Sequence, residues 1–155
     1  MKRLISLLTF AVLFAAVPAC FAADDPNVGT WKLDEAKSKI VAGAPKNTTV
    51  VYSTAGDSIK VVVDGVGADG KPAHNEWTGK FDGKDYPLVG DATADTRCYK
   101  KIDSNTLELT NKKAGKVIMT GTITFSADGK SRTVVINGTD ASGKAISSTA
   151  VYNKQ

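Results

Sequence analysis

Cysteine and histidine are almost absent from this 155-residue chain. It contains two cysteines, Cys20 and Cys98, and one histidine, His74. Cys20 falls in the expected leader described below, so Cys98 would be alone in the mature domain, which then has no internal disulfide. A Ser-His-Asp or Cys-His catalytic arrangement that does not use His74 is impossible, because the chain has no second histidine. A metal site on His74 and Glu76 would need a further ligand. The sequence therefore predicts no enzyme activity, no metal and no cofactor.

Charge of one sign is not concentrated anywhere in the chain. The formal net charge is +4, and two of the positive charges, Lys2 and Arg3, stand at the start. Nucleic-acid-binding domains usually carry a basic patch or stripe, and the sequence shows none. The long apolar run, Leu4 to Val17, is shorter than the roughly 20 residues that a membrane-spanning helix needs. We expect neither a nucleic-acid partner nor a membrane span.

The apolar run has the form of an export signal. It follows a basic start and is ended by Pro18, and small residues at Cys20 and Ala22 suit cleavage after Ala22, with cleavage after Ala23 as the alternative. The expected product is periplasmic or secreted. We assign the chain to a signal peptide, a short tail and a single domain, over residues 1–22, 23–28 and 29–155.

A second interpretation concerns Cys20. The stretch "VPAC", which ends at Cys20, resembles the lipobox of bacterial lipoproteins, whose cysteine is lipidated. Lipidation would make the product a lipid-anchored envelope protein instead of a freely soluble one. The oligomeric state is left open.

From Gly29 onward the chain shows short alternating runs and no sustained helical spacing. Turn sequences such as "ADGK" and "FDGK" separate the runs, because glycine takes the positive φ that tight hairpins require. Successive side chains of a strand point to opposite faces, so one face of each run is core and the other is solvated. In the clearest run the core face would carry Val117, Met119, Gly121, Ile123 and Phe125.

Two segments interrupt the hairpins. About one helical turn is expected around Glu35 to Lys39, and a longer loop is expected over Pro87 to Thr96. The remaining runs predict an all-β fold of about eight to ten antiparallel strands, closed into an up-and-down β-barrel because closure removes exposed edges. A two-sheet β-sandwich is the alternative.

The two ends of the domain resemble the calycin superfamily, which comprises lipocalins and fatty-acid-binding proteins. The resemblance rests on "VGTWKL" (Val28 to Leu33) and on "TAVY" (Thr149 to Tyr152), and the chain reads as a small exported bacterial form. It implies a barrel that binds a small apolar or amphipathic molecule. The fatty-acid-binding branch places an arginine where this chain has Ala150. Lipocalins place a late arginine over the opening tryptophan, and Arg132 could take that role over Trp31.

Candidate ligand contacts follow from the faces of the strands. Aromatic residues on core faces either fill a small barrel or line its cavity. The candidates for lining a cavity are Trp31, Trp77, Phe81, Phe125 and Tyr152.

Arg97 and Tyr99 form an Arg-x-Tyr pair in "TRCYKKI". The pair could contact an anionic head group if its face points into the barrel. We expect the outward orientation instead, with Cys98 between them as a small buried filler. The alternative function is a packed barrel that acts through its surface, as an envelope interaction module or a hydrolase inhibitor.

Overall fold

Ten strands in chain order build the domain. The computed structural model describes residues 25–139 and 143–155, so the expected signal peptide and Cys20 lie outside the described residues. In these ranges η1 (Glu35–Lys37), a 3-10 helix, is the one helical element. Within the same ranges no helix has the length and hydrophobicity to cross a membrane. The strands are β1 (Gly29–Leu33), β2 (Lys46–Ala55), β3 (Ser58–Val66), β4 (Pro72–Gly79), β5 (Asp82–Val89), β6 (Thr96–Lys101), β7 (Thr106–Lys113), β8 (Lys116–Phe125), β9 (Ser131–Thr139) and β10 (Ala145–Lys154).

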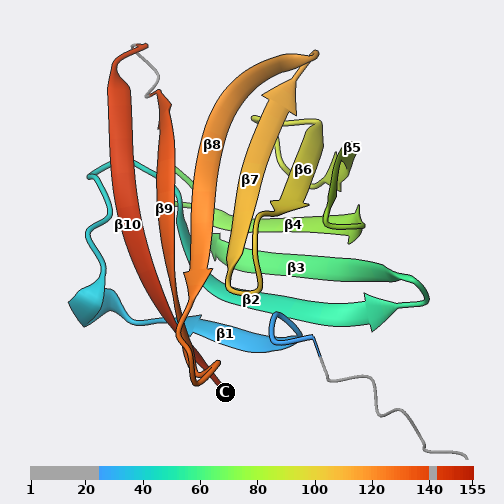
Figure 1. Cartoon of the computed structure of the whole chain (residues 1–155). Helices are drawn as coiled ribbons and strands as arrows, with labels where there is room; N and C mark the ends of the chain where they lie inside the picture. The colour runs from blue at the N-terminus through green and yellow to red at the C-terminus, as the bar shows by residue number, and fades with distance from the viewer. Residues whose placement is uncertain (1–24, 140–142) are drawn as a thin grey trace, which may run out of the picture.

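Strand β1 closes the sheet into a barrel. It pairs with β2, where Gly29 is opposite Tyr52, and with β10, where Leu33 is opposite Tyr152. Every other strand pairs with its neighbours in the chain, which gives a closed antiparallel up-and-down order. The predicted barrel is confirmed, and the two-sheet sandwich does not form. In Figure 1, β2, β3 and β4 run nearly across the direction of β7 to β10, so the walls of the barrel cross at a steep angle.

Inward-facing side chains from all ten strands form one core. The predicted alternation along β8 holds from Met119 to Phe125, but Val117 is 57% exposed. The reason is a shift in the β7–β8 register: Asn111 is opposite Met119, whereas the next residue, Lys112, is opposite Val117. The extra residue on β8 is a bulge, and it turns Val117 outward.

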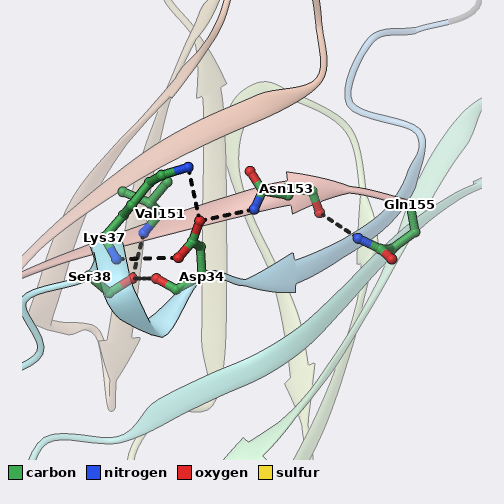
Figure 2. A network of polar contacts seen from close by, with 6 residues as sticks. All are labelled: Asp34, Lys37, Ser38, Val151, Asn153 and Gln155. Carbon is green, nitrogen blue, oxygen red and sulfur yellow. Dashed lines mark hydrogen bonds and ion pairs between the residues drawn. The ribbon is translucent and has the colours of Figure 1, made fainter.

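The predicted helical turn is η1, which ends at Lys37. Asp34 caps it by accepting a hydrogen bond from the backbone N–H of Lys37 at 3.3 Å. Figure 2 shows how this turn is tied to β10: the Asp34 carboxylate accepts from Asn153 Nδ2 at 3.1 Å, and Ser38 Oγ accepts from the backbone N–H of Val151 at 2.9 Å. These contacts hold the β1–β2 connection against the last strand.

The predicted loop over Pro87 to Thr96 is shorter than expected. Strand β5 continues to Val89 and β6 begins at Thr96, so residues 90–95 alone lie outside strands. Pro87 is itself paired with Thr96 across β5 and β6. A proline inside a strand is tolerated where its nitrogen meets no carbonyl partner, and that condition is met on the β4 side of β5.

Candidate functional site

The barrel wall opens between β4 and β5. These two strands, both fully described, form two register pairs, Glu76 with Val89 and Trp77 with Leu88. The preceding pair of strands, β3 and β4, is in register along eight residues of β4, from Pro72 to Gly79. The wall is therefore continuous up to Trp77 and interrupted beyond it.

Pro87 explains where the ladder stops. Leu88 donates its N–H to Asp95 O at 2.9 Å, on the side of β6. Because successive N–H groups of a strand alternate in direction, the nitrogen of Pro87 faces β4 and has no hydrogen to donate. The hydrogen-bonded contact with β4 cannot be extended past this residue.

The ring of Tyr86 packs into the interruption against Gly79. A Cβ atom at Gly79 would lie 2.5 Å from Tyr86 Cγ and 2.7 Å from Trp77 Cζ2, closer than real contacts allow. Tyr86 and Trp77 meet edge to face, with ring centroids 5.7 Å apart. Only glycine at position 79 leaves room for both rings.

A pocket of about 240 Å³ lies at this opening. It is lined by Glu76, Trp77, Thr78, Pro87 and Val89, and Val89 is 66% exposed. Drug-sized ligands usually occupy roughly 300–1,000 Å³, so this pocket suits a small molecule or one part of a larger one. We refer to it as the β4–β5 pocket.

A second pocket, of about 230 Å³, lies beside η1. It is lined by Glu35, Ser38, Ile40 and Lys46, and Lys46 Nζ is 3.1 Å from Glu35 Oε1. Its lining is mostly polar and its single apolar member is Ile40. It therefore offers less apolar contact than the β4–β5 pocket.

Trp77 is held rigidly behind the β4–β5 pocket. Its indole N–H donates to Arg97 O at 2.9 Å. Its ring stacks on Phe81, with centroids 6.3 Å apart, and meets Tyr99 edge to face at 4.8 Å. Of the five aromatic residues predicted to line a cavity, Trp77 lines a pocket and Phe81 supports it from within.

The other three predicted lining residues pack together elsewhere in the core. Trp31 meets Phe125 edge to face at 5.5 Å, and Arg132 Cζ lies 4.7 Å from the Trp31 ring centroid and 5.0 Å from that of Tyr152. The predicted packing of Arg132 over Trp31 is confirmed. Neither described pocket is lined by Trp31, Phe125 or Tyr152. A ligand-lining role for these three stays a prediction.

The expected outward orientation of Arg97 and Tyr99 is wrong. Their side chains are 5% and 2% exposed, inside the barrel. The register explains this, because Arg97 is opposite Asn111 and Tyr99 is opposite Leu109, both of which face the core. Arg97 Nε donates to Asn111 Oδ1 at 2.8 Å, and its Nη1 donates to Asn75 Oδ1 at 3.3 Å. No carboxylate in the described ranges forms an ion pair with it.

Cys98 is correspondingly turned outward and is half-buried, so its expected role as a buried filler is wrong too. Partial burial raises the pKa of the thiol above its ordinary value, and the nearby Asp85 carboxylate raises the pKa further. Only Lys112, among the main neighbouring charges, acts in the opposite direction. A raised pKa leaves less thiolate near neutral pH, which opposes a nucleophilic role.

Sequence reasoning missed Tyr52, which stands between the two buried arginines. Its hydroxyl donates to Tyr99 Oη at 3.5 Å, and Arg132 Cζ is 4.9 Å from its ring. Burial raises the pKa of Tyr99 far above its ordinary value, and burial also raises the pKa of Tyr152 to about 12. The alternation of Val50 and Tyr52 would have placed Tyr52 on the core face.

His74 lies on the outer surface with two carboxylates. Its Nδ1 is 2.7 Å from Asp64 Oδ1 and its Nε2 is 3.6 Å from Glu76 Oε1. The hydrogen bond with Asp64 is the main reason that the pKa of His74 is raised. Across the described part of the chain, no three His, Cys, Asp or Glu side chains are grouped to hold a metal ion.

Comparison with known proteins finds likeness in structure alone. No protein-family model matches the chain, and no curated protein matches it. It is similar to the solved structure of EF1p2_mFAP2b bound to DFHBI, with 13% identity, a TM-score of 0.48, and coverage of 84% of this chain and 94% of that one. It is also similar to the solved structure of a redesigned beta barrel, mFAP1, bound to DFHBI, with 16% identity and a TM-score of 0.45. The match covers 83% of this chain and 95% of that one. The barrel architecture stated above rests on the strand pairing of this chain.

Proposed function

We propose that this protein is an exported, non-catalytic barrel that binds a small apolar or amphipathic molecule at the β4–β5 pocket. The observation that carries the proposal is a pocket of about 240 Å³ over β4 and β5, whose lining combines the exposed Pro87 and Val89 with Trp77, a residue of the core. Pro87 and Val89 supply exposed apolar contact, and Thr78 and Glu76 supply polar groups at the rim. This combination is typical of small-molecule sites.

An anionic group on such a molecule would be bound by Arg97 and Tyr99. The backbone of Arg97 already contacts Trp77, and its guanidinium has amide partners but no carboxylate partner in the described chain. Tyr86 is opposite Arg97 in the register and its ring meets that of Trp77 edge to face. We therefore place the apolar part of the ligand in the pocket and its charged end past the Tyr86 ring.

The test uses 8-anilinonaphthalene-1-sulfonate, a small amphipathic anion whose fluorescence rises in apolar surroundings. The wild type should bind the dye saturably, and Val89→Phe should weaken binding at least about tenfold, which corresponds to about 1.4 kcal/mol. Val117→Phe is the matched control, because Val117 is an exposed strand valine at 57% and lines neither described pocket. Equal affinity in the two variants would place dye binding elsewhere and overturn the proposed site.

The natural ligand is sought by native mass spectrometry of the protein purified from its own source. A retained mass that is lost in Val89→Phe supports the proposal and identifies the molecule. The same preparation tests export, because cleavage after Ala22 gives a mature N-terminus at residue 23. Fatty-acid labelling of Cys20 would instead reveal a lipid-anchored form.

The second candidate function is a packed barrel that acts through its surface. It is favoured by the close packing of Trp31, Phe125 and Arg132, none of which lines a described pocket. An envelope protein or a hydrolase would then be the partner. Absence of a retained mass together with unsaturable dye binding would select this function over ligand binding.

A further inference from the structure

Arg132 is a buried cation, and two of its three side-chain nitrogens have no hydrogen-bond partner in the described residues. Its side chain is 2% exposed, and these two nitrogens are Nε and Nη1. No carboxylate there lies within ion-pair distance of it. Removing a charged group from water costs several kcal/mol unless a partner compensates.

Other buried donors in the same core are satisfied. The indole N–H of Trp31 donates to Asn27 O at 3.0 Å, and that of Trp77 donates to Arg97 O. Tyr152 Oη donates to Asn47 O at 3.0 Å. In the described residues the one other buried side-chain atom without a partner is the acceptor Asn27 Oδ1, so unpaired donors in this core are confined to Arg132.

The aromatic surroundings of Arg132 compensate its charge in part. Its Cζ lies 4.7 Å from the Trp31 ring centroid, 4.9 Å from Tyr52 and 5.0 Å from Tyr152. Ring faces attract the cation electrostatically, but they have no lone pair for the N–H groups in the guanidinium plane. What the site still requires is a hydrogen-bond acceptor, preferably one with negative charge.

We propose that Arg132 binds one small monovalent anion of the halide class inside the barrel. The acceptor must be small, because Nε and Nη1 are shielded from solvent and enclosed by rings. A single charge balances the single guanidinium. This site is separate from the β4–β5 pocket, whose lining does not include Arg132.

Tryptophan fluorescence reads this site directly, since Trp31 is in contact with Arg132. Iodide is titrated into the full mature protein, with potassium gluconate holding the ionic strength because its anion is too bulky to enter. The wild type should show a saturable component of quenching in the millimolar range, affecting one of the two tryptophans. Arg132→Met, which keeps the length of the side chain and removes its charge, should leave only weak, linear quenching.

Lys154→Met is the matched control. Lys154 Nζ lies 5.3 Å from the same Trp31 ring, so this variant also removes a cation near the indole, but one that is only half-buried and that donates to Pro26 O at 3.1 Å. Saturable quenching should persist in it. Equal quenching in wild type and Arg132→Met, or its loss in Lys154→Met alone, would overturn the proposal.

A second measurement does not depend on any variant. Crystals of the wild type grown without halide and transferred to bromide should show an anomalous peak within about 3.5 Å of Arg132 Nε or Nη1, the range of halide hydrogen bonds. No peak there, or a water oxygen that persists in bromide, would show that the acceptor is not an anion. Both readouts are independent of dye binding, so this inference and the proposed function can fail separately.

Discussion

The guanidinium carbon of Arg132 on β9 lies 4.7 Å from the centroid of the Trp31 indole on β1, two strands apart around the barrel. The pair connects β1, which closes the barrel, with β9, which lies on the far side of β10. Its stability contribution combines packing of the arginine stem with the attraction of a cation to aromatic rings.

Substitution of Arg132 separates these two contributions. Arg132→Ala removes both and leaves a cavity, and we expect it to lower the free energy of unfolding by about 2–4 kcal/mol. Arg132→Met keeps most of the volume and removes an unpaired charge, so its cost should stay below about 1.5 kcal/mol. Urea denaturation measures both values. Equal losses would show that the charge, and not the packing, supplies the stability.

Gly79 is expected to be intolerant of even one added carbon. Gly79→Ala would place a Cβ 2.5 Å from Tyr86 Cγ, and we expect a loss of about 1–3 kcal/mol from overpacking. Gly138→Ala is the control, since its Cβ would meet nothing closer than 3.3 Å. The comparison is made by thermal or urea unfolding. A mild Gly79→Ala with enhanced dye binding would mean instead that Tyr86 swings out and opens the pocket.

His74 should titrate above its ordinary pKa of 6.5. Proton NMR can follow it alone, because the chain has no other histidine. Asp64→Asn should lower the pKa of His74 more than Glu76→Gln does, since the hydrogen bond with Asp64 is the largest cause of the shift. An unchanged pKa in Asp64→Asn would contradict the contact at 2.7 Å.

The sign of the linked stability follows from that shift. A histidine whose folded-state pKa is raised stabilises the fold fully below its unfolded pKa near 6.5, and this contribution is lost as pH rises through the folded value. The wild type should therefore lose more stability than His74→Gln between about pH 6 and 8. Denaturant midpoints across this range measure the difference.

Cys98 should react slowly with thiol reagents. Because burial and Asp85 raise the pKa of the thiol, alkylation by iodoacetamide at pH 7 should be slower than that of free cysteine. Asp85→Asn should increase the rate by removing a like charge from the forming thiolate. A rate at or above that of free cysteine would reopen a reactive role for this residue.

The sequence alone determined the local periodicity, and with it much of the fold. Alternation with a period of two set which side chains of β8 face the core from Met119 to Phe125, and glycine-containing turns marked several of the hairpins. A closed antiparallel barrel followed because consecutive hairpins leave exposed edges unless the first and last strands meet. The packing of Arg132 over Trp31 was predictable from the resemblance of the opening strand.

Tertiary structure alone decided register and therefore orientation. Arg97 and Tyr99 alternate with Cys98 in either orientation, and only pairing with Asn111 and Leu109 turned the arginine inward. A single bulge reversed Val117, and Pro87 stopped the β4–β5 ladder beside Trp77 to form the pocket. These outcomes depend on partners distant in the chain. Alternation with a period of two shows that neighbouring side chains face opposite sides of the sheet, but it does not show which of them faces the core.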